Sequence, residues 1–166
     1  MTSADYWIHH LSLLPHPEGG FYKETYRASE TIPEEALPER FTASRNFSTA
    51  IYFLLRSDDR SLFHKIKSDE LWHFHKGDTL SIYALSDNGL TTYLLGDNPE
   101  KGESLQVAIP ANAWFGARIT GNGNGYVLTS CTVSPGFDFR DFELANQRCL
   151  LSEFPMHHRI IHELTK

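Results

Sequence analysis

The chain has 166 residues, a net charge of −6 and an apolar content of 40%, which suits one soluble domain, residues 1–166, with a single core. Lys and Arg total 15 without clustering, so a nucleic-acid partner is not expected, because such a surface needs concentrated positive charge. No apolar run approaches the ~18 residues of a membrane span, and residues 1–6 lack a signal-peptide pattern. We therefore expect a cytoplasmic protein with no membrane partner.

The predicted elements begin with a short helix over residues 4–14, with Ser3 as its N-cap. Residues 15–20, Pro-His-Pro-Glu-Gly-Gly, break the helix, and residues 21–27 alternate like a strand. Further strands follow, the first of them strongly apolar and expected to be buried on both faces. They cover residues 48–56, 61–66, 70–75, 79–85, 91–95, 105–109, 114–119 and 126–133.

Turn signals such as Asp87-Asn-Gly89 and the glycine-rich residues 121–125 separate these strands. Short strands at about ten-residue spacing with such turns indicate an antiparallel sandwich or barrel. Residues 139–147 and 155–164 have helical patterns, so short helices are expected to flank one β domain.

The most informative stretch is Glu70-Leu-Trp-His-Phe-His-Lys-Gly77. Side chains two residues apart on a strand share a face, which predicts Glu70, Trp72 and Phe74 on one face and Leu71, His73 and His75 on the other. His64 lies six residues before Glu70, so an unbroken strand places both on one face, unless a bulge at residues 67–69 changes the phase. A histidine and a carboxylate in one cavity can hold a metal, act as acid and base, or bind a polar ligand.

This pattern resembles a cupin. The usual first cupin motif is Gly-x5-His-x-His-x3/4-Glu-x6-Gly, and His64, Glu70 and Gly77 match its first histidine, its glutamate and its last glycine. Ile66 stands at the second histidine position, and Asp58 stands at the leading glycine position.

The second cupin motif, Gly-x5-Pro-x-Gly-x2-His-x3-Asn, is matched by Pro110. Asn112 replaces its glycine, Phe115 its histidine and Ile119 its asparagine. Asn at the glycine position is tolerable, because Asn visits left-handed backbone angles more readily than most residues.

More specifically, the chain resembles the cupin-5 family, formerly a domain of unknown function. The matching stretches are residues 16–22, 48–55, 63–77 and 133–143. The resemblance implies an all-β, RmlC-like cupin jelly-roll barrel with short N- and C-terminal helices, and a homodimer. It implies no established reaction.

The resemblance supplies two candidate metal ligands, His64 and Glu70, whereas Ile66 and Phe115 stand where further ligands are expected. A catalytic metal typically has three protein ligands and an open position, so a third ligand would have to come from elsewhere, such as Tyr52 or a differently aimed His75. We therefore favour no cofactor, with a divalent metal on His64 and Glu70 as the alternative.

Without a metal, His64 is the candidate general base and Glu70 the carboxylate that orients it. Tyr52 or Tyr83 would return a proton from across the cavity. Sugar-nucleotide 3,5-epimerases share the jelly roll and use a comparable histidine and tyrosine, and Leu62-Phe-His64 is similar to their base-bearing strand. This hypothesis is a metal-independent isomerase or epimerase for a sugar- or nucleotide-like substrate. The alternative reading of His64 is a buried histidine that Glu70 satisfies.

A third hypothesis is a non-catalytic ligand-binding module, because aromatic walls with a few polar groups are typical of small-molecule pockets. The aromatic fraction of the chain is 13%. Candidate ligand-binding side chains are Trp72, Phe74, His75, Tyr83, Trp114 and Phe115.

Five other residues receive structural interpretations, and one of the five keeps an alternative. Cys131 and Cys149 are expected to be reduced, mostly buried thiols. Asp138 and Asp141 are interpreted as first-turn helix acids and surface charge. Glu18 belongs to a tight turn, with the alternative that it reaches the cavity mouth, since loops at barrel rims often carry function.

Overall fold

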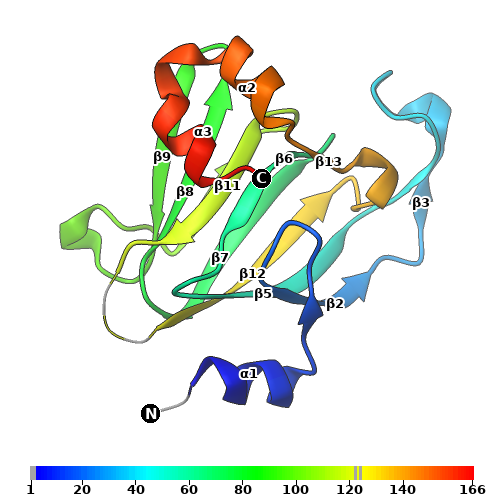
Figure 1. The fold of residues 1–166 in the computed structure, drawn as a ribbon. Coiled ribbons are helices and arrows are strands. Elements are labelled where there is room, and N and C mark those ends of the chain that lie inside the picture. Colours follow the sequence, from blue (N-terminus) through cyan, green and yellow to red (C-terminus); the bar gives the residue numbers. More distant parts are fainter. Residues whose placement is uncertain (1–2, 122, 124) are drawn as a thin grey trace.

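In the computed structural model, which describes residues 3–121, 123 and 125–166, two antiparallel sheets pack face to face (Figure 1). The six-stranded sheet contains, in spatial order, β1 (Leu14–Pro15), β2 (Phe21–Arg27), β5 (Thr49–Arg56), β12 (Tyr126–Ser134), β7 (Asp69–Gly77) and β10 (Gln106–Ile109). The five-stranded sheet contains β13 (Glu143–Leu144), β6 (Ser61–Lys65), β11 (Trp114–Ile119), β8 (Leu80–Ser86) and β9 (Gly89–Leu95). A separate pair joins β3 (Thr31–Ile32) to β4 (Arg45–Asn46).

Short helices lie on the outer faces of both sheets (Figure 1). Helix α1 (Ala4–Leu11) covers the six-stranded sheet, and α2 (Gln147–Glu153) and α3 (His158–Glu163) cover the five-stranded sheet. Single 3-10 turns are η1 (Glu34–Ala36), η2 (Pro99–Lys101), η3 (Phe139–Asp141) and η4 (Pro155–His157). None of the helices in the described part of the chain is long and apolar enough to cross a membrane.

Ser3 is the N-cap of α1, as predicted, because its side chain accepts a hydrogen bond from the Tyr6 N–H at 3.2 Å. The helix ends three residues before the predicted bound, because Ser12 adopts a left-handed conformation with φ of 55°. Left-handed residues commonly end helices.

The main core lies between the two sheets. Phe53, Trp72 and Val127 of the six-stranded sheet pack there with Ile82 and Phe115 of the five-stranded sheet, and each is almost fully buried. Smaller apolar clusters lie under α1 and under α2 and α3. Several strands are therefore apolar on both faces, because each sheet is covered on its outer side as well.

The structure does not contain the helix that was predicted over residues 139–147. It is replaced by η3, by β13 and by the first residue of α2. Asp138 caps the single turn by accepting from the Arg140 N–H at 2.9 Å, and Leu144 then pairs with His64 at the edge of the five-stranded sheet. Residues 143 and 144 therefore form a strand that pairs with β6 and do not continue a helix.

The strand predictions over residues 21–27 and 114–119 match β2 and β11 in both bounds. Asn112 has φ of 63°, which confirms the left-handed conformation expected where the cupin motif has glycine. Within the predicted turn over residues 121–125, Asn122 and Asn124 lie outside the described residues.

The C-terminal turn supports β6, the strand that carries His64. The carbonyl oxygen of Leu164 accepts a hydrogen bond from the Phe63 N–H at 2.7 Å. Leu164 is fully buried and packs in one cluster with Phe63 and Leu150. Figure 1 shows the chain end lying close to β6.

Candidate functional site

A cavity of about 540 Å³ lies inside the sandwich, a size typical of small-molecule sites. Residues of β2, β5, β7 and β12 line it on the side of the six-stranded sheet, and His64 of β6 lines it on the other side. Its remaining walls come from the turn before β2 and from residues 137–142. Most of the lining surface is apolar, with Phe53, Trp72, Phe137 and Phe142 among its aromatic members.

The predicted alternation of β7 is confirmed. Glu70 and Trp72 line the cavity, and Phe74 packs against the main core. His73 and His75 lie on the outer face, where their Nε2 atoms contact side-chain hydroxyls of β12 at 3.1 and 2.9 Å. His64 and Glu70 meet in one cavity, although β6 and β7 belong to different sheets.

His64 is paired directly with Glu18. The Nε2 atom of His64 lies 3.0 Å from Oε2 of Glu18, and both side chains are buried. Ser61 donates its hydroxyl hydrogen to Oε1 of Glu18 at 2.7 Å. The other ring nitrogen of His64, Nδ1, lies 2.7 Å from the carbonyl oxygen of Leu62.

These contacts define how many protons the pair holds. A carbonyl oxygen only accepts, so Nδ1 of His64 carries a hydrogen. In the neutral ring Nε2 is then bare, and a bare nitrogen 3.0 Å from a carboxylate oxygen requires one proton between them. Burial raises the pKa of Glu18 and lowers the pKa of His64, which favours the neutral form with the proton on Glu18.

The turn before β2 holds Glu18 in this position. The His16 N–H donates to the Gly20 carbonyl at 2.9 Å, and the Leu62 N–H donates to the Glu18 carbonyl at 2.9 Å. Gly19 and Gly20 have φ of 110° and 72°, a region that favours glycine. The predicted tight turn and the alternative role of Glu18 at the cavity are therefore both present in the structure.

His16 is a further cavity residue that the sequence interpretation did not single out. Its Nδ1 atom accepts from the Glu18 N–H at 3.3 Å and lies 3.5 Å from Oε2 of Glu18. Burial lowers its pKa, so the neutral ring is favoured and its hydrogen lies on Nε2.

Glu70 is the second acid of the cavity. Burial raises its pKa to about 7, while the nearby His64 opposes the shift and Glu18 adds to it. Cys131 donates a thiol hydrogen bond to the Glu70 side chain, and burial raises the pKa of Cys131 well above its usual value. Cys131 is buried, as expected, whereas Cys149 is exposed, which corrects the prediction for that thiol.

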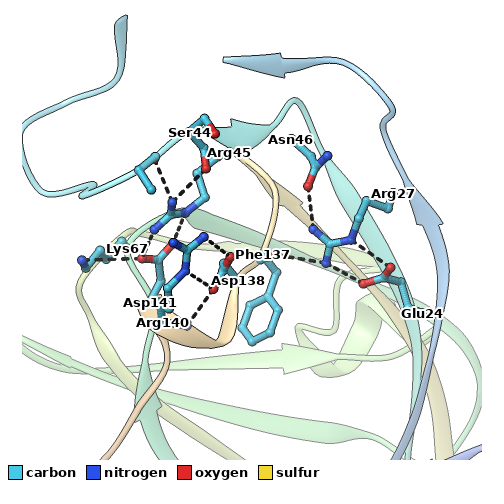
Figure 2. Close-up of polar contacts among 11 residues, drawn as sticks. Glu24, Arg27, Ser44, Arg45, Asn46, Lys67, Phe137, Asp138, Arg140 and Asp141 are labelled. Carbon is cyan, nitrogen blue, oxygen red and sulfur yellow. Dashed lines mark hydrogen bonds and ion pairs between the residues drawn. The ribbon is translucent and has the colours of Figure 1, made fainter. Parts of the chain in front are cut away.

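Figure 2 shows the polar contacts that hold residues 137–142 against the rest of the domain. Arg45 donates from Nε and an Nη atom to the two carboxylate oxygens of Asp141 at 2.7 and 2.6 Å. Both side chains are buried, and Lys67 lies 3.5 Å from the same carboxylate. Asp141 is therefore a buried anchor, which corrects its interpretation as surface charge.

Arg27 holds the same segment from β2 (Figure 2). It donates to both carboxylate oxygens of Glu24 at 3.0 and 2.7 Å, to the Asn46 side chain at 2.8 Å and to the Phe137 carbonyl at 3.0 Å. The guanidinium is thereby committed to protein acceptors, although Arg27 lines the cavity.

Two predicted site residues lie on the outer side of the six-stranded sheet. Tyr52 packs against the cluster under α1, and its ring centroid lies 6.0 Å from that of His75. This placement corrects the expectation that Tyr52 faces His64 across the cavity, and His75 is likewise not placed to be a metal ligand beside His64.

The aromatic predictions divide in the same way. Tyr83 and Trp114 pack under α2 and α3, outside the five-stranded sheet. Phe115 lies inside, with its ring centroid 4.2 Å from that of His64, so it supports the imidazole rather than lining the cavity. Among the aromatic residues predicted to bind a ligand, Trp72 lines the cavity. Phe74 packs against the main core.

The donor set does not fit the metal that the cupin motif positions imply. Ile66 lines the cavity without a lone pair to donate, and Nε2 of His64 is already bonded to Glu18. Across the described residues, no three His, Cys, Asp or Glu side chains are grouped to hold a metal ion.

The sequence model of the Cupin_5 family, described as Cupin superfamily (DUF985), matches residues 5–145. The chain belongs to this family. A curated relative, the uncharacterized protein YML079W of Saccharomyces cerevisiae, is 28% identical over 149 residues, which cover 84% of this chain and 74% of the yeast protein.

Solved structures show the same fold. A hypothetical protein from Leishmania major is 36% identical with a TM-score of 0.89 and covers 99% of each chain. Protein SO0799 from Shewanella oneidensis is 40% identical with a TM-score of 0.89, covering 100% of this chain and 99% of its own. Oxalate decarboxylase from Bacillus subtilis, at 11% identity and a TM-score of 0.55, covers 90% of this chain and 36% of its own, and supports the fold alone. The predicted cupin jelly roll is confirmed.

All four stretches of the family resemblance contribute to the cavity lining, and two of them supply residues outside the predicted site. His16, Glu18 and Tyr22 come from one of them, and Val133 and Phe137 come from the other. The match of these stretches to the family was the available sequence signal for such cavity residues, because strand periodicity does not reveal them.

Proposed function

We propose that the cavity binds a small, neutral, sugar-like molecule and catalyses a metal-independent isomerisation or epimerisation. The observation that carries the proposal is Glu70, a buried carboxyl group in the cavity wall with its pKa raised to about 7. A group that transfers protons works best when its pKa lies near the operating pH. Beside it, Glu18 and His64 hold one shared proton.

Two sets of contacts favour Glu70 over His64 as the group that removes a proton. Both ring nitrogens of His64 are engaged, one with the Leu62 carbonyl and one with Glu18. The Glu70 carboxylate accepts from Cys131 and has further lone pairs for a ligand. We therefore assign His64 to hold and position the proton of Glu18.

In the proposed step, the Glu70 carboxylate takes a proton from a carbon next to the carbonyl group of the substrate. The C–H electron pair forms a C=C bond, and the carbonyl π pair moves onto oxygen to give an enolate. A proton from the Glu18–His64 pair then adds to the opposite face of that carbon and gives the epimer. Transfer of the Glu70 proton back to the pair restores the starting state, so no oxidant or reductant is needed.

The charges of the lining favour a neutral sugar over a nucleotide. Glu18, Glu24, Glu70 and Asp138 all line the cavity, and a phosphate would meet these acids. Two cations also line the cavity. Arg27 has four of its five N–H donors on Glu24, Asn46 and Phe137, and Lys23 donates to the Leu11 carbonyl at 3.1 Å.

Solvent-deuterium exchange into neutral keto-sugars, followed by mass spectrometry, tests the proposal. Wild-type protein should introduce deuterium next to the carbonyl, and Glu70→Gln should reduce the rate by at least about 100-fold, as expected for loss of a general base. Glu100→Gln, a matched change at an exposed position, should leave the rate unchanged. Exchange that survives in Glu70→Gln would remove Glu70 from the role of base.

The second candidate is a non-catalytic binding module, which the largely apolar lining of the cavity favours. The same experiment separates the two candidates. Ligand-induced thermal stabilisation of the protein without deuterium incorporation would support binding alone.

We also propose a homodimer, as the family resemblance implies. Exposed apolar side chains near the β1–β2 edge, including Leu14 at 66% and Tyr26 at 55% exposure, support a protein contact there. Sedimentation equilibrium tests it, since a mass equal to the 18.9 kDa chain would contradict a dimer. The cytoplasmic location stays a prediction.

A further inference from the structure

Three aromatic side chains from residues 137–142 form one side of the cavity, and we call them the aromatic wall. Phe137, Phe139 and Phe142 all line the cavity. The ring centroids of Phe137 and Phe139 lie 5.0 Å apart, and those of Phe139 and Phe142 lie 6.1 Å apart. Both pairs are edge to face, which is a favourable arrangement of aromatic rings. The wall is therefore one continuous apolar surface.

The aromatic wall extends from the proton-transfer groups to the solvent. At its inner end, the ring centroid of Phe142 lies 5.3 Å from that of His64. At its outer end, Phe139 is 52% exposed. His64 and Glu70 are buried, with 2% and 7% of their surface exposed. A ligand whose carbonyl group reaches Glu70 therefore has its outer part beside the aromatic wall.

The backbone that carries the aromatic wall is held in place without a ligand. Arg27 donates to the Phe137 carbonyl at 3.0 Å, and Arg45 donates twice to Asp141 at 2.7 and 2.6 Å (Figure 2). These contacts lie at both ends of the segment that carries the three rings. A preformed surface of this kind saves the cost of ordering the protein when a ligand binds.

Apolar side chains of the six-stranded sheet extend the apolar lining next to Glu70. Val133 lies opposite Glu70, and Ile51 lies opposite Cys131, the donor to Glu70; both Val133 and Ile51 line the cavity. A simple sugar would turn hydroxyl groups towards these carbon surfaces, which is unfavourable because they would lose their hydration without gaining a partner. A cavity of about 540 Å³ also has room for a drug-sized ligand.

We propose that the ligand of this cavity carries an uncharged aryl or alkyl substituent, which lies against the aromatic wall while its carbonyl group faces Glu70. The substrate class is then a neutral hydroxyketone with an apolar group at the end remote from the reacting carbon. This inference rests on the proposed function, because the assignment of Glu70 as the base fixes which end of the ligand is innermost.

Isothermal titration calorimetry with three neutral ketones and wild-type protein tests the inference. The probes are L-erythrulose, its 4-O-benzyl ether and its 4-O-(2-hydroxyethyl) ether, which adds a polar substituent. The benzyl ether should bind at least about tenfold more tightly than erythrulose, because apolar surface is buried, and the hydroxyethyl ether should bind about as tightly as erythrulose. Equal affinities for erythrulose and the benzyl ether overturn the inference, and so does an equal gain from the hydroxyethyl ether.

A matched pair of variants tests where the substituent lies. Phe139→Ser should reduce the affinity gain of the benzyl ether over erythrulose by at least about threefold. Phe47→Ser is the control, because Phe47 has a similar exposure of 47% and lies away from the cavity lining, so the gain should be kept. Thermal transitions check that both variants fold. A gain that stays whole in Phe139→Ser overturns the placement against the aromatic wall.

The outcomes also separate this inference from the proposed function. Tighter binding of the benzyl ether without deuterium incorporation next to its carbonyl supports the apolar substituent and contradicts the isomerase. Deuterium incorporation into both ketones with equal affinities supports the isomerase and contradicts the apolar substituent.

Discussion

The Nε2 atom of His64 lies 3.0 Å from Oε2 of Glu18, although one residue stands on β6 and the other in the turn before β2. One proton satisfies both atoms, and burial favours the neutral form of each residue. When Glu70 ionises, its charge favours the imidazolium form of His64, and the shared proton is drawn from Glu18 towards the ring. The two acids of the cavity are thereby linked through one imidazole.

Replacing Glu18 with Ala should lower the free energy of unfolding by about 1–3 kcal/mol, because buried Ser61 and His64 lose their acceptor or donor. Glu18→Gln should lose less than about 1 kcal/mol, because its amide accepts from Ser61 and donates to His64. Urea unfolding at fixed pH measures both values. Equal losses would contradict the shared-proton geometry.

Arg45→Met should destabilise the fold by about 3–5 kcal/mol, because it leaves the buried carboxylate of Asp141 without its bidentate partner. The control is Arg140→Met, which breaks the pair with Asp138 in the same segment. The Arg140 side chain is exposed, so the loss of that pair should change stability much less than the loss of Arg45 does. Chemical denaturation compares the two, and similar small effects would show that Arg45 does not anchor residues 137–142.

Glu70 should make the protein less stable as pH rises from about 4.5 to about 7. The pKa of Glu70 is raised from 4.5 to about 7 in the fold, so in this window the unfolded chain has released a proton that the folded protein keeps. The contribution is fully present below pH 4.5 and amounts to about 3 kcal/mol.

Unfolding titrations of wild type and Glu70→Gln across this pH window test that prediction. The amide mimics the protonated acid, so the variant should lack this part of the pH dependence, whereas Glu100→Gln should follow wild type. An identical pH slope in wild type and Glu70→Gln would show that the fold does not raise the pKa of Glu70.

Gly19→Ala should disrupt the turn that carries Glu18. Gly19 has φ of 110°, and an added Cβ would overlap the carbonyl oxygen of Arg60. The expected loss is at least about 3 kcal/mol, from backbone strain and overpacking together.

Gly102→Ala is the matched control, since φ is 77° there but no atom lies within 4 Å of the added Cβ. Its expected loss is about 1–2 kcal/mol, from the left-handed conformation alone. Thermal unfolding of both variants measures the difference, and equal transitions would argue against a tight approach of the turn to β6.

Periodicity predicted the inner face of β7 correctly, because Glu70 and Trp72 alternate with the outward-facing His73 and His75. The same reasoning did not place Tyr52, because helix α1 buries the outer face of β5 and leaves no polar side to set the phase. Tyr83 was misplaced for the same reason, because α2 and α3 cover the outer face of its strand.

Local sequence patterns could not predict which residues from distant segments pair with each other. Glu18 meets His64 because the Leu62 N–H bonds the Glu18 carbonyl, a contact that no spacing encodes. The sequence pattern around Asp141 is typical of a helix acid, but Arg45, from a separate strand, pairs with it in a buried contact. The family resemblance covered both segments without indicating these pairings.

The hydrogen bond from the Phe63 N–H to the Leu164 carbonyl makes the tail of the chain part of the scaffold behind His64. Removing that segment would remove the hydrogen bond beside His64 and could change the position of its imidazole, although the segment does not line the cavity. Substitutions at Leu164 should therefore alter the support of β6 without touching the cavity.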